Sequence, residues 1–505
     1  MKKILSVILS VVFVLSSFTV MSFADDTVYY EQPFETGTMG STTYRIPAII
    51  TLNNGSVLAV ADMRYEHGSD SPQNIDTLVA ISEDGYTDWE YTVVNHFDDY
   101  ADGVSDSDSA SFIDSAVVQS AETDRIFIIT DAYMSGIGYQ QTVKGTGYVE
   151  VDGEQCLSLT DGSNSYYLAA FEDGFATVMT SDGTATAYTV DAEYALYKDG
   201  EAIYTAQVGS DEMAQQNVFY TSSDIYLAVS TSYLWLRYSD DNGETWSDPV
   251  MLNTQVKSSK EGFLGVGPGK GFVTTVDGHE RIIFCVYDTV TRENVSTIYS
   301  DDNGETWQRG DETSIRLGVG KTSEAQIVSL PDGSLRMYAR NGSDYIAYAD
   351  STDGGVSWTK FKADMNLTAR GNCMVSFINY SQEINGQSVI LGSFASDPTS
   401  REDGVVVLGL VNDDNSVDWI TTYHVTDGFF AYSCLTELAD GNIGYLYEDE
   451  AAHISYSILT IGDDGSISEI NGDNIEYDDS LSIWDKFVLF VRSTFYKILN
   501  VFNLL

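Results

Sequence analysis

Basic residues, cysteine and proline are all scarce in this 505-residue chain. It holds 25 Lys and Arg against 76 Asp and Glu, which gives a formal net charge of −51 at pH 7. Such a negative field repels nucleic acid and anionic membrane surfaces, and it excludes nucleic-acid binding as a function. An anionic substrate would need local, pre-arranged cations, so the positions of the few arginines are informative.

The cysteines give no sign of a metal site. Only four occur, far apart and in no metal-ligand spacing: Cys156, Cys285, Cys373 and Cys434. A large exported protein does not need disulfides, so we expect none to be essential. No other metal-binding motif is found. We therefore expect neither a metal nor any other cofactor.

The first 24 residues have the pattern of a secretory signal peptide. Lys2 and Lys3 form a basic start, an apolar run follows from Ile4 to Phe18, and Ser22–Ala24 supplies a small-residue cleavage site. We therefore leave residues 1–24 out of the fold and expect a secreted, extracellular protein. The alternative is an uncleaved anchor, which would keep the protein at the cell surface.

Short alternating apolar runs dominate the rest of the chain. Examples are residues 125–130, 281–287 and 404–411, each bounded by Asp, Asn or Gly. Such runs are typical of strands joined by turns. Few stretches before residue 480 keep a helical period, so the fold is expected to be mostly β.

An eight-residue pattern recurs four times. The copies are Ser239–Trp246, Ser300–Trp307, the looser Ser351–Trp358 and the degenerate Ser82–Trp89. In such a turn the aspartate accepts hydrogen bonds from backbone amides, glycine takes a positive φ, and tryptophan packs between sheets. We therefore interpret Asp241, Asp302 and Asp353 as structural rather than catalytic.

These turns resemble the Asp boxes of sialidase-like β-propellers. The resemblance implies an all-β, six-bladed propeller, and the spacings of 61 and 51 residues suit about one four-stranded blade each. The first two copies are 157 residues apart, which leaves a surplus. We interpret residues 144–228 as a small inserted β domain, because they carry their own aromatic strand pattern. Residues 25–143 and 229–470 then form the two parts of the propeller.

The C-terminal segment departs from the β pattern. Residues 471–505 read as a linker and tail, and 483–505 have the pattern of an amphipathic helix too interrupted by charge to span a bilayer. Three roles stay open for this helix: docking on the propeller, weak contact with a membrane surface, or binding a partner.

Near the mature N-terminus stands Arg45-Ile46-Pro47. It matches the Arg-Ile-Pro motif of bacterial exo-α-sialidases, and with the Asp boxes it makes the chain resemble the larger clostridial and streptococcal type over about residues 30–465. The resemblance implies that Arg45, Arg340 and Arg401 grip a sialic acid carboxylate. It also implies that Glu448 steadies Arg45. Arg336 and Arg370 are the alternatives for the second and third arginines.

The same resemblance implies the catalytic groups. Tyr432 is the implied nucleophile, Glu324 the carboxylate that takes its proton, and Asp70 the general acid and base on a loop. Asp62 and Asp76 are alternatives to Asp70, although both flank strands and look structural. Asp114 would lie near the N-acetyl group of the substrate.

Together these residues imply an exo-α-sialidase that hydrolyses terminal sialic acid with retention, through a covalent tyrosyl intermediate. Its substrates would be sialylated glycans, glycoproteins or glycolipids, and the enzyme is expected to be a monomer. Two alternatives remain: an intramolecular trans-sialidase that releases an anhydro product, and a non-catalytic propeller that binds sialic acid.

Overall fold

The computed structural model describes residues 29–97, 109–206, 213–220, 226–290, 292–313, 318–450 and 453–470. The expected signal peptide and the amphipathic tail lie outside these residues. The described chain is almost entirely β, with one four-residue helix, α2 (Asn253–Val256), and the 3-10 turns η1 (Thr38–Gly40) and η3 (Tyr139–Gln141). No helix among the described residues has the length and apolarity needed to cross a bilayer.

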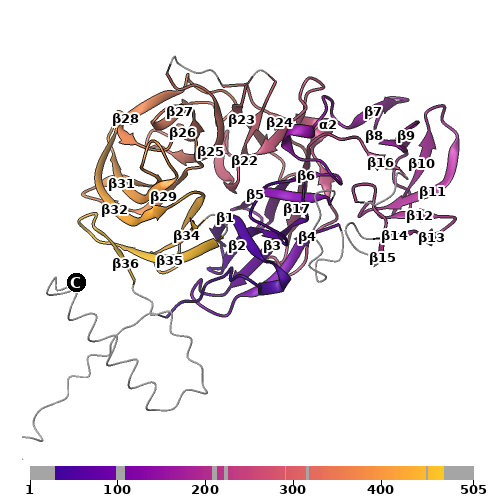
Figure 1. Ribbon diagram of the computed structural model, residues 1–505. Coiled ribbons are helices and arrows are strands. Elements are labelled where there is room, and N and C mark those ends of the chain that lie inside the picture. The colour runs from indigo at the N-terminus through magenta and orange to yellow at the C-terminus, as the bar shows by residue number, and fades with distance from the viewer. Residues whose placement is uncertain are drawn as a thin grey trace, which may run out of the picture. The chain divides into compact units, whose positions relative to one another are not determined.

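The sheets of Glu31–Ile470 form a ring, as Figure 1 shows. Three are four-stranded antiparallel sheets. One contains β25 (Thr322–Ser329), β26 (Leu335–Asn341), β27 (Tyr345–Ser351) and β28 (Lys362–Thr368), and the next contains β29 (Ser376–Ile384), β30 (Gln387–Ala395), β31 (Glu402–Val411) and β32 (Val417–Phe429). The third contains β33 (Ser433–Glu437), β34 (Ile443–Glu450), β35 (His453–Ile461) and β36 (Ile467–Glu469). A fourth contains β19 (Leu264–Val266), β21 (Phe272–Val276), β22 (His279–Asp288), β23 (Asn294–Ser300) and β24 (Gln308–Arg309). This arrangement confirms the all-β propeller.

A nine-stranded sheet completes the ring. Its strands are β1 (Thr43–Thr51), β2 (Val57–Arg64), β3 (Ile75–Ser82), β4 (Glu90–Asn95), β5 (Ser111–Gln119), β6 (Ile126–Tyr133), β17 (Tyr233–Ser239), β18 (Val250–Met251) and β20 (Gly269–Lys270). β3 and β5 join through the single parallel pair Ile75 and Ser111. The expected number of six blades stays a prediction, since it depends on counting this sheet as two.

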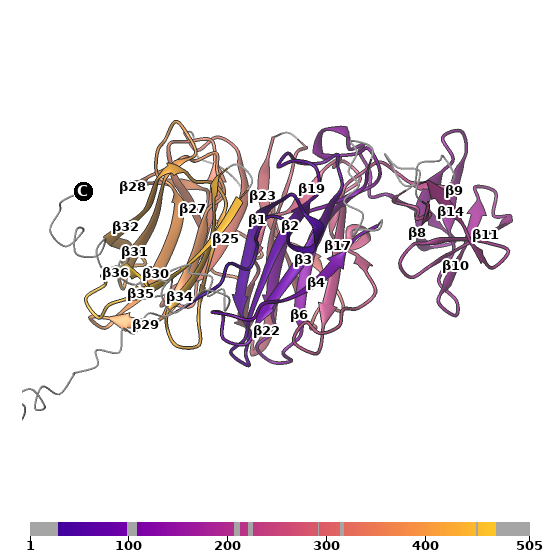
Figure 2. The same cartoon turned by 60° about the horizontal axis from the view of Figure 1, so that its bottom comes forward.

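The two ends of the described chain meet in the ring. The backbone amide of Thr51 in β1 donates to Thr436 Oγ1 in β33 at 3.0 Å. The Cys434 thiol donates to the Ile49 carbonyl at 3.7 Å. The first and last sheets therefore pack side by side (Figure 2), which places residues near 45 next to residues near 432 and 448.

The repeated turns have the expected structural role. In one of them, Asp302 Oδ1 accepts the amide of Thr306 at 2.9 Å and the Ser300 hydroxyl at 2.8 Å. Trp307 of this turn is buried at 3% exposure against Phe127 and Phe284 of two neighbouring sheets. The turn aspartates stabilise the blades and lie apart from the site described below.

The expected insertion contains a sheet of its own. Its strands are β7 (Tyr148–Val151), β8 (Glu154–Thr160), β9 (Ser165–Leu168), β10 (Phe175–Thr180), β11 (Ala185–Asp191), β12 (Leu196–Lys198), β13 (Glu201–Ala202) and β16 (Leu227–Ala228), beside the pair β14 (Tyr204–Ala206) and β15 (Met213–Gln215). Phe219 packs edge-on against Trp235 of the propeller at 5.4 Å, and Glu193 pairs with Arg237. The insertion thus shares a core with the propeller, and its exact boundaries stay a prediction.

Candidate active site

Three polar groups meet inside the ring, around the hydroxyl of Tyr432. This hydroxyl donates to Glu324 Oε1 at 2.8 Å. Arg340 Nη1 donates to both Glu324 oxygens, at 2.8 and 3.0 Å, and to the Tyr432 oxygen at 3.0 Å. Because β25 and β26 form one hairpin, Glu324 and Arg340 reach the same end of the sheet, as the sequence predicted.

Burial sets the protonation state of this cluster. The Tyr432 side chain is 6% exposed, and desolvation together with the Glu324 carboxylate raises the pKa of the phenol well above 10. Arg340 and Arg401 oppose this shift. The resting hydroxyl is therefore neutral, with a carboxylate positioned to receive its proton.

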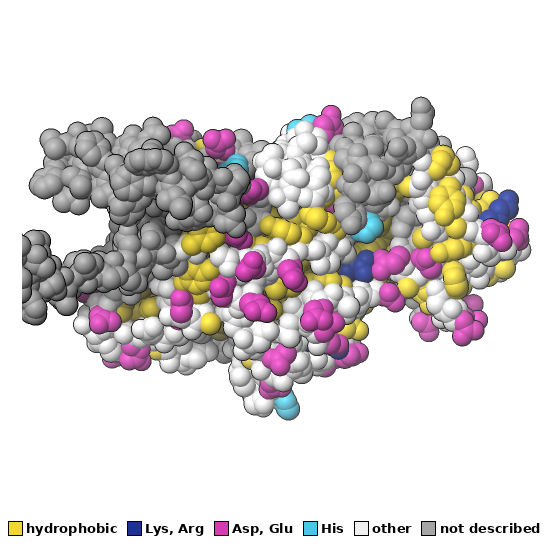
Figure 3. Space-filling view, turned by 90° about the horizontal axis from the view of Figure 1, so that it is seen from below, with side chains coloured by type: hydrophobic (Ala, Val, Ile, Leu, Met, Phe, Trp, Pro, Cys, Tyr) yellow, Lys and Arg dark blue, Asp and Glu magenta, His cyan; other side chains and the backbone are white. Residues whose placement is uncertain are grey.

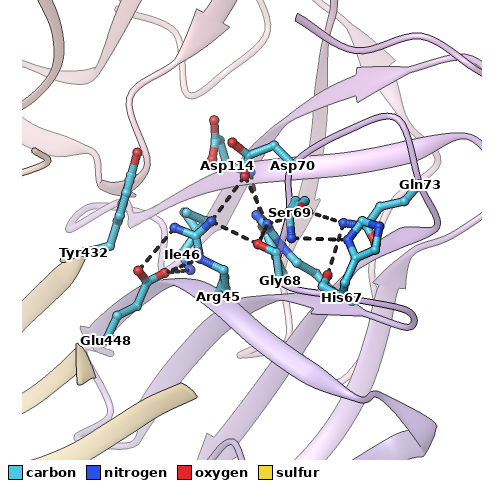
Figure 4. Close-up of polar contacts among 12 residues, drawn as sticks. Arg45, Ile46, His67, Gly68, Ser69, Asp70, Gln73, Asp114, Tyr432 and Glu448 are labelled. Atoms are coloured by element: carbon cyan, nitrogen blue, oxygen red, sulfur yellow. Dashed lines mark hydrogen bonds and ion pairs between the residues drawn. The ribbon is translucent and has the colours of Figure 1, made fainter. Parts of the chain in front are cut away.

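Arg45 is held by Glu448 from the last sheet (Figure 4). Its Nε and Nη2 donate to the two oxygens of Glu448 at 3.1 and 3.2 Å, and the amide of Ile46 donates to the same carboxylate at 3.0 Å. Glu448 is fully buried, and the Arg45 side chain is 11% exposed. The carboxylate thus orients Arg45, whose Nη1 donates to the Gly68 carbonyl at 3.2 Å and to Asp70 Oδ1 at 3.3 Å.

The loop between β2 and β3 carries Asp70. Its side chain is 69% exposed, and Oδ1 lies 3.3 Å from Arg45 Nη1 and 3.0 Å from Arg64 Nη1. Desolvation raises the pKa of Asp70, but the guanidiniums of Arg64 and Arg45 outweigh it and hold the pKa below its usual value. Asp70 is therefore a carboxylate in this state.

Arg64 was not among the residues predicted from the sequence. It is fully buried, pairs with Asp62 at 2.7 Å, and donates to the carbonyls of Gly68 and Ser69 at 2.8 Å each. Arg64 therefore fixes the Asp70 loop through hydrogen bonds from the buried interior. A signal was available in the sequence, because Asp62 and Arg64 directly follow the apolar run Val57–Ala61 on the same strand. Charged side chains are costly to bury there unless they are paired.

Asp114 lies on β5 where the register with β6 breaks, and its φ is +63°. Its amide donates to Asp62 Oδ1 at 3.1 Å. Burial, reinforced by the negative charges of Asp62 and Glu324, raises the pKa of Asp114 well above its usual value. Burial likewise raises the pKa of Asp62 to about 7, although Arg64 opposes the shift.

Arg401 completes a ring of cations around Tyr432. Its guanidinium lies 5.6 Å from the centre of the Tyr432 ring, and that of Arg45 lies 5.7 Å from it. With Arg340 bonded to the Tyr432 oxygen, three guanidiniums surround one phenol. They come from three different sheets, so only the closed ring brings them together.

The four residues that the sequence offered in place of these groups are each engaged in a contact of their own. Arg370 donates to the Pro398 carbonyl at 3.1 Å, and Arg336 pairs with Asp350 at 2.6 Å. Asp62 is buried against Arg64, and Asp76 is buried where it accepts the Tyr65 hydroxyl at 2.8 Å.

The groups around Tyr432 surround a cavity of about 200 Å³. Five predicted residues line it: Asp70, Asp114, Glu324, Arg340 and Tyr432. Tyr139, Tyr287 and Ile113 form part of its wall, and none of its lining comes from residues 144–228. On the face drawn in Figure 3, acidic side chains far outnumber basic ones. Arg340 is the cation among the residues that line the cavity, whereas Arg45 and Arg401 lie near the Tyr432 ring without lining it.

Within the described residues, no group of three or more His, Cys, Asp or Glu side chains is placed to hold a metal ion. The cavity and its surroundings offer a buried phenol with a neighbouring base, the lining guanidinium of Arg340 with those of Arg45 and Arg401 near the Tyr432 ring, and a carboxylate on a loop. This set suits nucleophilic attack on an anionic substrate, followed by proton transfer to a leaving group.

Comparison with known proteins relates the chain to sialidases. The BNR repeat-like domain family matches residues 203–447. The chain is 35% identical to an anhydrosialidase of Macrobdella decora over 84% of this chain and 60% of that protein. It is 30% identical to sialidase B of Streptococcus pneumoniae over 82% and 63%. The chain thus spans about 60% of the length of these curated relatives.

Solved structures extend the likeness to the fold. An intramolecular trans-sialidase from Ruminococcus gnavus superposes with a TM-score of 0.77 at 34% identity, covering 86% of this chain and 98% of that one. A leech intramolecular trans-sialidase superposes with a TM-score of 0.76 at 32% identity, covering 85% and 70%.

Proposed function

This chain belongs to the sialidase family, and we propose that it removes terminal sialic acid from glycans with Tyr432 as its nucleophile. The observation that carries the proposal is the Tyr432 hydroxyl, which bonds to a buried Glu324 at 2.8 Å between three guanidiniums. A buried tyrosine serving only for packing needs neither the base nor the cations.

The three arginines suit the carboxylate of sialic acid. A guanidinium presents a rigid fork of donors, which binds a carboxylate through paired, charge-assisted hydrogen bonds. Arg45 and Arg340 have little freedom, because Glu448 and Glu324 orient them. The binding groups are thus arranged before substrate arrives, which reduces the entropy lost on binding.

A tyrosine is favoured as nucleophile because the anomeric carbon of sialic acid carries this carboxylate. An anionic nucleophile would be repelled by it, whereas a neutral phenol is not. As the Tyr432 oxygen bonds to the anomeric carbon, its proton passes to Glu324. Arg340 donates to the same oxygen and stabilises the negative charge that develops on it during this transfer.

Asp70 supplies the second proton transfer. When the substrate carboxylate takes Arg45 from it, the pKa of Asp70 rises and the side chain takes up a proton from water. The protonated Asp70 donates this proton to the leaving oxygen as the glycosidic bond breaks, which leaves a tyrosyl-linked sugar. It then takes a proton from the incoming water, the bond to Tyr432 breaks, and Glu324 returns the proton to the phenol. Two displacements at one carbon give retention.

A second product is favoured by the relatives. Two of the similar structures are intramolecular trans-sialidases, and one curated relative is an anhydrosialidase. In that reaction a hydroxyl of the bound sugar replaces water in the second step, and an anhydro sugar is released. The first displacement, and all residues assigned to it, would be the same.

Incubation with sialyllactose tests both proposals. Release of lactose with free sialic acid supports hydrolysis, and release with a sugar lighter by one water supports intramolecular transfer, as read by mass spectrometry. If the purified protein releases no lactose, the proposed activity is wrong.

We also propose that the enzyme is exported and works as a monomer on sialylated glycoproteins or glycolipids. Export is tested by locating the protein in cells or medium and sequencing its N-terminus, because protein retained in the cells with Met1 in place would contradict it. Sedimentation of the full chain and of residues 1–480 with liposomes tests whether 483–505 contacts membranes.

A further inference from the structure

A second cavity lies in the insertion and is lined by residues of β7, β8, β9 and the turn that joins β10 to β11. Figure 1 labels these strands. Its volume is about 660 Å³, which is large enough for a small ligand. It shares no lining residue with the active-site cavity. We call this cavity the insertion groove.

The floor of the insertion groove is the outer face of β8 and β9. Ser158 is paired across these strands with Tyr167, and Thr160 with Ser165, so the four side chains share one face. The opposite face, with Leu157 and Leu168, packs into the core of the insertion, and Leu159 from that face also lines part of the groove. The sheet therefore presents hydroxyl groups to the groove.

Several of these polar groups have no partner within the described part of the protein. Tyr167 is only 9% exposed, yet its hydroxyl forms no hydrogen bond with any described residue. The same holds for the side chains of Ser158 and Ser165. The Tyr167 hydroxyl is not among the fully buried unpaired oxygens of the described residues, so it opens onto the groove that its residue lines. A ligand with its own donors and acceptors can bond to it there.

The walls restrict the chemistry of that ligand. Glu150, Asp152 and Asp182 line the groove, and no Lys or Arg among the described residues does. The three carboxylates repel an anion such as sialic acid or a phosphate. Val149 and the Tyr167 ring offer apolar surface, but a wholly apolar ligand would leave the floor hydroxyls unpaired.

We propose that the insertion groove binds a neutral sugar. A pyranose ring has an apolar face for Tyr167 and Val149, and a rim of hydroxyls that can donate to carboxylates and exchange hydrogen bonds with serines. The ligand class is thus the uncharged hexose or N-acetylhexosamine residues of a glycan.

The groove lies close enough to the active site to serve the same glycan. Val149 follows Tyr139, which lines the active-site cavity, by ten residues, and ten extended residues span at most about 35 Å. If the proposed function holds, a branched glycan bound in the groove raises the local concentration of its sialylated arms. Binding of neutral sugar itself does not depend on that function.

The test uses the full protein and a panel of lactose, N-acetyllactosamine and maltose, with binding followed by saturation-transfer NMR and calorimetry. Ser165→Leu fills the exposed end of the floor, and Ser163→Leu is its matched control on the adjacent turn, outside the groove. We expect at least one sugar to bind, at least tenfold weaker binding to Ser165→Leu, and unchanged binding to Ser163→Leu. Both variants should cleave a small fluorogenic sialoside as the wild type does.

Three results would overturn the proposal. One is that no sugar in the panel binds to the folded wild type at millimolar concentration. Another is equal binding to wild type and Ser165→Leu. The third is binding of spermidine without any sugar, which would make the groove a cation site. Should Ser165→Leu fail to fold, Tyr167→Phe serves instead, because it removes only the unpaired hydroxyl.

Discussion

The carboxylate of Asp70 lies 3.3 Å from Nη1 of Arg45, so the proposed acid pairs with an arginine proposed to bind substrate. Both cannot keep this contact once a substrate carboxylate occupies Arg45. Binding would therefore free Asp70 from one of the three guanidiniums that lower its pKa, those of Arg64, Arg45 and Arg401.

This exchange predicts a difference between two pH profiles. The value of kcat/KM reports the free enzyme, in which Asp70 loses its proton at low pH, and kcat reports the complex. Because substrate neutralises the field of Arg45, the pKa of Asp70 should rise on binding. With sialyllactose, whose leaving alcohol needs a proton, we expect the basic limb of kcat to lie at higher pH than that of kcat/KM. Coincident limbs would contradict the exchange.

Asp70→Asn is the matched variant for that experiment. It should lower kcat on sialyllactose by roughly 10²–10⁴-fold, the usual contribution of a positioned proton donor. An aryl sialoside with a good leaving group should be affected less in its first step. Equal loss on both substrates would count against Asp70 as the acid.

Tyr432→Phe should lower turnover by at least about 100-fold, because it removes the nucleophilic oxygen and leaves the ring in place. Tyr299→Phe is the control, since that hydroxyl bonds to Gln308 on β24 away from the cavity. Turnover of a fluorogenic sialoside and thermal unfolding measure the two effects. Wild-type turnover in folded Tyr432→Phe would refute the nucleophile.

Glu448→Gln should raise KM more than it lowers kcat, because Arg45 loses part of the buried carboxylate that orients it. The free energy of unfolding should fall by about 1–3 kcal/mol, the cost of an imperfectly paired buried group. Glu437→Gln, on β33 and bonded to Ser381, is the control. An unchanged KM would mean that Arg45 is held by other contacts.

Arg401→Lys should raise KM by about tenfold or more, because a charge-assisted contact is worth roughly 1.5–3 kcal/mol and an ammonium cannot reproduce the fork. Arg370→Lys, which changes a side chain bonded to the Pro398 carbonyl, should leave KM near its wild-type value. The reverse outcome in a Michaelis–Menten series would make Arg370 the third arginine.

Asp302→Ala should affect stability and leave catalysis intact. It removes hydrogen bonds within the turn from Ser300 to Trp307, and we expect a loss of about 1–2 kcal/mol in the free energy of unfolding. Activity per folded molecule should equal that of the wild type. A selective loss of kcat would give this aspartate a role that its position does not explain.

The repeated blades and one hairpin of the site could be predicted from local sequence patterns alone. The repeated turns predict blades because an aspartate, a glycine and a tryptophan at fixed spacing encode local geometry. The hairpin from Thr322 to Asn341 likewise places Glu324 beside Arg340, since strand pairing follows from turn position. Local patterns did not predict the roles of Asp70 and Tyr432, which were inferred from the resemblance to a family.

Only the tertiary structure decided which distant groups touch. Arg45 and Glu448 are 403 residues apart and meet because the ring closes, which no local pattern reveals. The role of Arg64, which bonds to the Asp70 loop, was missed for the same reason. Only the packed structure shows that this arginine is buried and not exposed at the surface. The pairing of Asp70 with two guanidiniums, and hence its lowered pKa, likewise exists only once separate strands are packed together.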